Sequence, residues 1–520
     1  MPKATKNLAL DSCRALAERT NLPTSNASPS LKAWLAQPRK RAHCEASSEN
    51  DDLGCRKRVK LSPSPTDSDA YESDNSDLDL NSRQVNQHRR RNRTPWDVAT
   101  HMTPVSSCRR SFLSTLPILQ SFVSSNKVDV FRCHSVLEGS FMAPPYACSY
   151  SHSAQTSGQP LLAVATEQGT VYILNTSKRK EWDPEPSHNV LQPHNNGVFD
   201  IKWNLTDRLL ATSSGDRSTR ISDVETRQTI HSLRGHEGTV KCISWDPTHP
   251  DILSTGGRDG LICIWDLRVS GNLSEGTATL GPVTRIYAAH EEVGPNGKRK
   301  TGKRKNAPVP KSVTGLLYSD TDPHYLISSG SADGILRCWD VRFTKKSKVK
   351  EPACLQSSPL DPTLSPGASR SRGIISLTQG TGPTLGLLFG LSADSRIHTY
   401  ERDSLTAFGN TYTHANLQTN FYVKIATSPC GRWLASGGAG PSGSSFMFDV
   451  SNATRSAAEY KGVELKGHAG DAGAVDWASD MLATCWDDGM VRVWRPESEI
   501  YRACAENAEE RRWNWCWASV

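Results

Sequence analysis

One short pattern recurs along this chain and constrains its fold more than any other feature. It consists of a run of small residues, an Asp-Gly turn, and an apolar alternation that reaches Trp six residues after the Asp. The clearest copies are residues 252–268, 326–342 and 481–495. Alternation of this kind is typical of half-buried β-strands, and Asp-Gly between two strands favours a tight hairpin. Each copy therefore predicts two antiparallel strands joined by a short turn.

Weaker copies of the pattern fill the rest of the region, at 161–176, 209–224, 388–403 and 433–450. Successive turns lie 43 to 48 residues apart, with two longer gaps that indicate insertions. A period near 45 residues with strand alternation is typical of a four-stranded propeller blade. The sequence thus predicts an all-β fold: a seven-bladed β-propeller over residues 110–497, with a basic insertion at 297–311.

Polar residues recur at fixed places in the blades, where His, Ser or Thr, Asp and Trp can form a buried hydrogen-bond chain that ties strands together. In the second blade the chain is incomplete, because Ser222 stands where Trp is expected. We interpret these residues as structural rather than as proton relays or hydrolase triads. The predicted sets are His236, Thr255, Asp259 and Trp265; His290, Asp333 and Trp339; and His468, Asp488 and Trp494.

These repeats resemble the WD-repeat family over roughly residues 128–497. The segment 498–520 follows them, and it carries Trp513, Trp515 and Trp517 at a spacing that puts them on one face of an extended strand. We expect this segment to pack onto the propeller. The alternative is an aromatic peptide that docks into a partner.

The positive charge is unevenly distributed. The chain has 61 Lys+Arg against 54 Asp+Glu, a net charge of +7. Residues 1–94 hold 17 basic and 12 acidic side chains, and residues 297–311 hold seven basic and no acidic ones. The remainder is slightly acidic, so the sequence does not predict a continuous basic groove for nucleic acid. Any contact with DNA is expected to be accessory.

Residues 1–109 are rich in Ser, Pro, Asn and charged residues and poor in apolar ones, which predicts a disordered tail. Two basic clusters within it, separated by an acidic, Ser-rich spacer, are typical of a nuclear import signal. The alternative is a pair of solvated charge runs. The predicted import residues, and with them a nuclear location, are Arg39, Lys40, Arg41, Arg56, Lys57, Arg58 and Lys60.

Several protein classes are not expected. No apolar run is long enough to span a membrane, and the first residues lack the apolar core of a signal peptide, so the cysteines are expected to be reduced. No CxxC pair or Cys/His cluster predicts a metal, and no cofactor is expected. The Gly438–Gly443 stretch matches GxGxxG but precedes a strand-like segment rather than a helix. With no catalytic motif, we predict a non-enzyme.

The predicted fold gives no structural reason for an arginine at two positions. Arg268 and Arg342 each lie two residues after a Trp-Asp pair, in neighbouring blades. We expect the strand to end at Trp-Asp and the Arg to point to solvent, where its planar fork can bind a partner's carboxylates or carbonyls. The alternative is an ordinary turn residue, as in many propellers.

Trp-Asp-x-Arg in successive blades resembles the docking box of WD-repeat substrate receptors, although Cys338 departs from the usual aliphatic residue before Trp339. Such receptors bind the adaptor damage-specific DNA-binding protein 1 in cullin-4 RING ubiquitin ligases. The resemblance implies that the adaptor-binding residues are Trp265, Asp266, Arg268, Trp339, Asp340 and Arg342.

Further stretches, including 161–176, 194–203 and 420–429, resemble the denticleless family in the same order and spacing. That family consists of substrate receptors of the cullin-4 ligase. The resemblance implies that this chain directs ubiquitin-dependent degradation of replication and cell-cycle proteins presented on the sliding clamp at chromatin. No Gln-x-x-aliphatic-x-x-aromatic-aromatic motif occurs in the sequence, so direct contact of this chain with the clamp stays an open question.

The basic insertion falls at the blade junction where the family carries one. The resemblance implies a contact with DNA phosphates or an acidic substrate near the clamp, and a contact of this kind would be salt-sensitive. The alternatives are a solvated insertion or a second import signal. The residues concerned are Lys298, Arg299, Lys300, Lys303, Arg304 and Lys305.

Two other functions remain open from the sequence. One is a nuclear WD-repeat scaffold that binds histones or chromatin without a ligase role. The other, an RNA-processing propeller, depends only on nuclear location and net charge.

Overall fold

The computed structural model describes residues 114–519 except for short gaps, and these described residues belong to one compact unit. The gaps are 137–138, 185, 187, 275, 292–309, 343–351, 353, 365–368, 441–442, 455–461 and 468–469. The predicted disordered tail with its import residues, the six basic residues of the insertion, and His468 lie outside the described residues.

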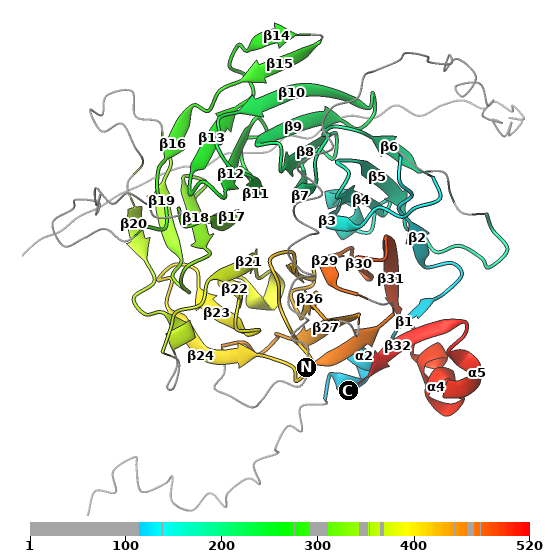
Figure 1. The fold of residues 1–520 in the computed structure, drawn as a ribbon. Helices are drawn as coiled ribbons and strands as arrows, with labels where there is room; N and C mark the ends of the chain where they lie inside the picture. The colour runs from blue at the N-terminus through cyan, green and yellow to red at the C-terminus, as the bar shows by residue number, and fades with distance from the viewer. Residues whose placement is uncertain are drawn as a thin grey trace, which may run out of the picture. The chain divides into compact units, whose positions relative to one another are not determined.

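The described strands form six sheets arranged around a ring, so the all-β propeller prediction is confirmed (Figure 1). Four of these sheets have four strands each. The first contains β3 (Pro145–Tyr150), β4 (Leu161–Thr166), β5 (Val171–Asn175) and β6 (Asn189–Leu191). Another contains β11 (Val240–Trp245), β12 (Ile252–Gly257), β13 (Ile262–Asp266) and β16 (Thr284–Ile286).

The next two four-stranded sheets follow along the chain. One contains β17 (Val313–Tyr318), β18 (Tyr325–Gly330), β19 (Arg337–Asp340) and β20 (Cys354–Ser357). The other contains β21 (Ile374–Gln379), β22 (Leu387–Ser392), β23 (Ile397–Glu401) and β24 (Ala407–Tyr412). In each sheet the strands follow one another from the centre of the ring outward, as Figure 1 shows.

The two remaining sheets are larger. A six-stranded sheet holds β7 (Val198–Trp203), β8 (Leu209–Ser214), β9 (Ser218–Asp223), β10 (Gln228–Arg234), β15 (Thr277–Leu280) and β14 (Asn272–Ser274). A ten-stranded sheet runs through β25 (Ile425–Thr427), β26 (Trp433–Ser436), β27 (Ser444–Asp449), β28 (Val463–Lys466), β32 (Trp515–Ser519), β1 (Phe122–Ser125), β31 (Met490–Pro496), β30 (Leu482–Trp486) and β29 (Ala472–Trp477), with β2 (Val130–Arg132) also paired to β31.

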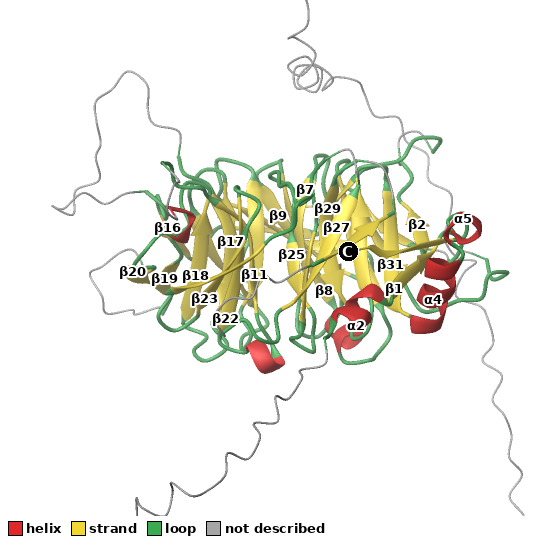
Figure 2. Ribbon diagram, turned by 90° about the horizontal axis from the view of Figure 1, so that it is seen from below, coloured by secondary structure: helices red, strands yellow, loops and turns green. Residues whose placement is uncertain are grey.

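Helices are few and short among the described residues, and Figure 2 shows them at the edges of the strand layer. They are α2 (Leu116–Gln120), α3 (His152–Gln155), α4 (Ser498–Glu506) and α5 (Ala508–Arg511), with 3-10 helices η2 (Pro362–Leu364) and η3 (Gly382–Thr384). No helix in the described part is long and apolar enough to cross a membrane. Each cysteine that the structure describes is a free thiol.

Neighbouring sheets pack face to face through buried apolar side chains. Ile262 and Ile264 of β13 lie in one cluster with Val313, Leu316 and Trp339 of the next sheet. Burying such side chains stabilises the ring by about 1.5–3 kcal/mol each. This is why the apolar alternation predicted the architecture.

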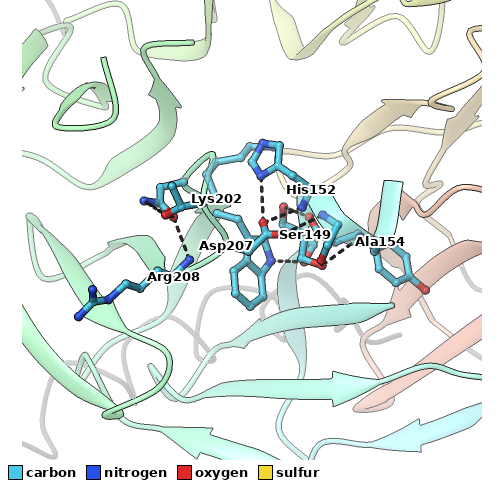
Figure 3. Close-up of polar contacts among 12 residues, drawn as sticks. Ser149, His152, Ala154, Lys202, Asp207 and Arg208 are labelled. Atoms are coloured by element: carbon cyan, nitrogen blue, oxygen red, sulfur yellow. Dashed lines mark hydrogen bonds and ion pairs between the residues drawn. The ribbon is translucent and has the colours of Figure 1, made fainter. Parts of the chain in front are cut away.

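A polar joint links the first two sheets on one face of the ring, shown in Figure 3. Asp207, in the β7–β8 turn, accepts the backbone N–H groups of His152 and Ser153 at 2.7 Å each. Burial alone would raise the pKa of this carboxyl, but the hydrogen bonds from Ser153 and His152 outweigh burial. The net pKa of Asp207 is lowered, so the carboxyl stays ionised. The joint fixes the start of α3 against the neighbouring sheet.

The two ends of the propeller region meet in the ten-stranded sheet. Strand β32 pairs antiparallel with β1 on one side, where Val123 faces Trp517, and with β28 on the other, where Leu465 faces Ala518. Ala518 is buried, while Trp513 is 72% exposed. The C-terminal segment therefore packs onto the propeller through β32, and Trp513 does not share the environment of the other two tryptophans.

Candidate functional site

The two Trp-Asp-x-Arg segments occupy equivalent corners of neighbouring sheets. Asp266 ends β13 and faces Ile252 at the start of β12, and Asp340 ends β19 and faces Tyr325 at the start of β18. The two sheets are adjacent, because the hydroxyls of Ser254 and Tyr318 lie 2.5 Å apart across their interface. Both corners therefore lie on the same face of the ring.

The tryptophans of these corners are part of the core. Trp265 is 1% exposed and Trp339 is 7% exposed. Each indole N–H donates to a hydroxyl of the neighbouring strand: Trp265 to Thr255 at 2.8 Å, and Trp339 to Ser328 at 2.9 Å. Two of the six predicted adaptor-binding residues thus act by holding the corner in place rather than by presenting their rings to a partner.

The arginines are exposed, but each is held by the Asp of its own corner. Arg268 Nε and Nη2 donate to the two carboxylate oxygens of Asp266 at 2.8 and 2.7 Å. Arg342 makes the same two-point contact with Asp340, with Nε 2.8 Å from Oδ1. Both arginines point to solvent as expected, but the carboxylate two residues earlier already binds one edge of each guanidinium, a contact that was not predicted.

This contact keeps both carboxylates ionised and orients both guanidinium groups. Hydrogen bonds from Arg268 and Arg342 lower the pKa of Asp266 and Asp340, so both carboxyls are ionised at neutral pH. The Arg side chains remain 60% and 51% exposed. Their Nη1 groups have no hydrogen-bond partner within the described ranges. Each corner therefore presents a preoriented donor edge to solvent.

The structure contains the predicted hydrogen-bond chain in full in the sheet of β11. His236 Nδ1 lies 3.0 Å from Asp259 Oδ2, and His236 Nε2 lies 2.8 Å from Thr255 Oγ1, which also accepts the Trp265 N–H. Burial lowers the pKa of His236, but the hydrogen bond with Asp259 outweighs it and the pKa rises to about 9. The pair is therefore a buried ion pair at neutral pH.

The next sheet departs from the prediction. His290 Nε2 lies 2.9 Å from Ser328 Oγ, which accepts the Trp339 N–H, but His290 Nδ1 is buried and has no partner among the described residues. Asp333 instead accepts the backbone N–H of Ile335. Burial lowers the pKa of His290 to about 3, so this histidine is neutral and the predicted link from His290 to Asp333 is absent.

The last predicted set is described only in part. Trp494 Nε1 donates to Thr484 Oγ1 at 2.9 Å, and Asp488 accepts the backbone N–H of Met490 at 3.0 Å. The sheet of β7 contains the incomplete set. His194 contacts Asp216 at 2.8 Å and Thr212 at 3.0 Å, and the Ser222 hydroxyl lies within hydrogen-bond distance of the Thr229 hydroxyl, where the other sheets have an indole. These contacts fit a structural role.

Sequence reasoning missed a further set of residues at the mouth of the central channel. Tyr146, Phe199 and Lys241 are each the second residue of an innermost strand, and each lines one cavity there. In each strand this second residue is partly exposed between two buried neighbours, and no motif in the sequence marks it. Across the described residues, no His, Cys, Asp or Glu side chains gather in a way that could hold a metal ion.

Comparison with known proteins identifies the family of this chain. Residues 156–248 match the profile of the anaphase-promoting complex subunit 4 WD40 domain, and residues 306–340 match the WD domain, G-beta repeat. The denticleless protein homolog of Danio rerio is 31% identical over 372 residues, covering 68% of this chain and 53% of that protein. Cell division cycle protein cdt2 of Schizosaccharomyces pombe is 32% identical over 371 residues, covering 68% of this chain and 70% of that protein. The chain belongs to the denticleless family.

The similarity of this denticleless-family chain to its relatives extends over 68% of its residues. The human denticleless protein homolog is 30% identical over 371 residues, which cover 46% of its length. The chain spans about half the length of the animal denticleless proteins that it matches, and a larger share of the fission yeast relative.

Proposed function

We propose that this chain is a non-catalytic substrate receptor of a cullin-4 RING ubiquitin ligase, which docks on the adaptor damage-specific DNA-binding protein 1. The observation that carries the proposal is the matched pair of Asp-held arginines, Arg268 and Arg342, on adjacent sheets of one face. Two preoriented guanidinium edges at a fixed separation suit a protein surface with acceptors at matching positions. Membership of the denticleless family supports the same conclusion.

The ring itself is proposed to have seven blades. The ten-stranded sheet divides naturally at the β32–β1 pairing into one blade built on β25–β28 and another built on β29–β31 with β1. Together with the other five sheets this gives the seven units expected from the repeat. Strand β32 then acts as a closing strand between the outer edges of two blades.

In this role the chain acts by proximity. One face would hold the ligase, and the receptor would bring a substrate lysine close to a charged ubiquitin-conjugating enzyme, which raises its effective concentration. The proposed substrates are replication and cell-cycle proteins presented on the sliding clamp at chromatin. Such a receptor needs no cofactor and no catalytic residue of its own.

Two further parts of the proposal concern residues outside the described ranges. The basic insertion, including Lys298 and Arg304, is proposed to contact DNA phosphates or acidic substrate near the clamp. The tail clusters around Arg39 and Arg56 are proposed to direct nuclear import. Neutralising the six insertion residues should slow turnover of a clamp-bound substrate, and neutralising both tail clusters should leave the protein in the cytoplasm. Unchanged turnover or unchanged nuclear accumulation would count against the respective part.

Co-purification tests the class of function. The intact tagged chain should recover the adaptor and cullin-4, and the double variant Arg268→Ala/Arg342→Ala should recover neither while its circular dichroism spectrum stays that of the wild type. Arg217→Gln, an exposed arginine in another hairpin turn, is the matched control. Recovery of histones without any ligase subunit would favour a chromatin scaffold instead.

A further inference from the structure

The same irregularity occurs in six of the innermost strands. In β3, β7, β11, β17, β21 and β29 the pairing register shifts across the second residue of the strand, so this residue has no opposite partner. A bulged residue of this kind is re-aimed out of the regular alternation. The bulged residues are Tyr146, Phe199, Lys241, Thr314, Ile375 and Gly473.

These bulges gather side chains at one mouth of the central channel. The first five bulged residues all line one cavity of about 390 Å³. They are only partly buried, whereas the residues on either side of them in the strands are buried. Their side chains are therefore not needed to fill the core, and they are available to a ligand.

Aromatic rings form one wall of this cavity. The ring centroids of Tyr146 and Phe199 lie 5.8 Å apart, and those of Tyr146 and Tyr422 lie 4.8 Å apart. Phe421, next to Tyr422, also lines the cavity and is 79% exposed. An exposed aromatic surface of this kind favours contact with an apolar or aromatic side chain.

Cations form another wall. Lys241 Nζ lies 3.6 Å from the centroid of the Phe199 ring, and Lys424 and Arg258 line the same cavity. No carboxylate of the described residues lies within 4.0 Å of the Lys241 or Arg258 side-chain nitrogens, and Lys424 Nζ is 3.9 Å from Asp200. Burial, and then repulsion by Lys424 and Arg258, lowers the pKa of Lys241 to about 8. Lys241 and Arg258 thus carry positive charge that is not paired with a carboxylate of the described residues, whereas Lys424 is paired with Asp200.

Acidic residues lie close enough to the aromatic wall to affect the ionisation of Tyr146. Burial, followed by the negative charges of Glu167 and Asp487, raises the pKa of Tyr146. Burial together with Asp471 and Glu167 raises the pKa of Asp487 to about 6. A nucleic-acid backbone with a charge on every nucleotide would meet repulsion here. A peptide with a single acidic side chain would not, because it can direct its remaining residues over the rings.

We propose that this channel mouth binds an extended segment of the substrate protein, with an Asp or Glu side chain between Lys241, Lys424 and Arg258 and a neighbouring apolar or aromatic side chain on the Phe199–Tyr146–Tyr422 wall. A carboxylate there can accept charge-assisted hydrogen bonds, which are stronger than hydrogen bonds to a neutral acceptor. The inference deepens the proposed receptor function, on which it rests, by naming the chemistry of the segment that is recognised.

Peptide binding to the purified full chain, without any ligase subunit, tests this proposal. The probes are fluorescein-labelled Gly-Phe-Asp-Phe-Gly and its counterparts with Asn or Lys in place of Asp, measured by fluorescence anisotropy. We expect the Asp peptide to bind at least about tenfold more tightly than the Asn peptide. The double variant Lys241→Met/Lys424→Met should lose this preference, whereas Arg217→Gln should keep it, and a ten-nucleotide oligothymidylate should not compete.

The result that would overturn the proposal is an Asp peptide that binds no more tightly than the Asn peptide, a preference that survives in the double variant, or equal competition by the oligonucleotide. A melting temperature of the double variant at or above that of the wild type shows that it folds. Arg268→Ala/Arg342→Ala should bind the Asp peptide like the wild type. The assay therefore separates failure of this site from failure of adaptor docking.

Discussion

His236 and Asp259 form a buried ion pair, with Nδ1 3.0 Å from Oδ2, whereas the residues at the same places in the next blade, His290 and Asp333, do not meet. Asp259 also accepts the backbone N–H groups of Glu237 and Leu261. One sequence pattern thus yields two different electrostatic arrangements in adjacent sheets. This contrast offers a matched test inside one molecule.

Asp259→Asn should lower stability much more than Asp333→Asn. The first substitution leaves a buried histidine without its anion, at a cost of about 2 kcal/mol. The second removes a carboxylate whose pKa is raised by burial and which has no histidine partner, so its cost should stay below about 1 kcal/mol. Thermal unfolding of both variants by circular dichroism is the measurement. Equal destabilisation would mean that Asp259 has no special role.

The His236 pair should also give stability a defined pH dependence. The pKa of His236 rises from 6.5 to about 9 on folding, so its contribution is fully present below pH 6.5 and is lost as the pH rises through 9. The stability difference between wild type and His236→Gln should therefore shrink between pH 6.5 and 9.5, by on the order of 2 kcal/mol. His290→Gln is the control, because folded His290 is neutral throughout this range, so its difference should change by less than about 0.5 kcal/mol, through titration of the unfolded chain near pH 6.5.

Lys241→Met should raise stability. Burial lowers the pKa of Lys241 from 10.5 to about 8, so the folded state binds fewer protons than the unfolded state between these values, and wild-type stability rises with pH there. The variant should exceed the wild type by about 2 kcal/mol below pH 8, and the gap should close toward pH 10.5. Chemical denaturation at pH 7 and 10 tests this, with Arg217→Gln as the control. A variant less stable than wild type at pH 7 would contradict it.

Truncation after Arg511 should destabilise the propeller by opening the sheet between β28 and β1. The lost strand β32 pairs on both edges and buries Ala518 against the core. We expect the melting temperature to fall by about 5 °C or more. Trp513→Ala should leave it almost unchanged, because Trp513 is exposed. An unaltered melting temperature after truncation would show that β32 contributes nothing to closure.

Much of the fold was predictable because the repeat encodes local structure. The six-residue step from Asp259 to Trp265 predicts a hairpin and its buried hydrogen bonds, and both are present. The contact of Arg268 with Asp266 was not predicted, because a side-chain conformation in a turn depends on backbone geometry that spacing does not reveal. The missing link from His290 to Asp333 was not predicted either, because spacing does not show which partner a side chain contacts.

The cavity at the channel mouth escaped prediction for another reason. Tyr146, Phe199 and Lys241 are far apart in the sequence and share no motif, and only closure of the ring brings them together. Their common signal is positional: each is the second residue of an innermost strand. A register shift of one residue changes the direction of a side chain without changing the apolar pattern of the strand.

The affinity of the purified chain for purified adaptor tests the central claim most directly. Biolayer interferometry should show that Arg268→Ala and Arg342→Ala each weaken binding by at least about tenfold, and that the double variant shows no binding. Asp266→Asn, which retains the guanidinium but loosens its orientation, should weaken binding less than Arg268→Ala. Arg217→Gln should bind like the wild type. Wild-type affinity in the folded double variant would contradict docking through these two corners.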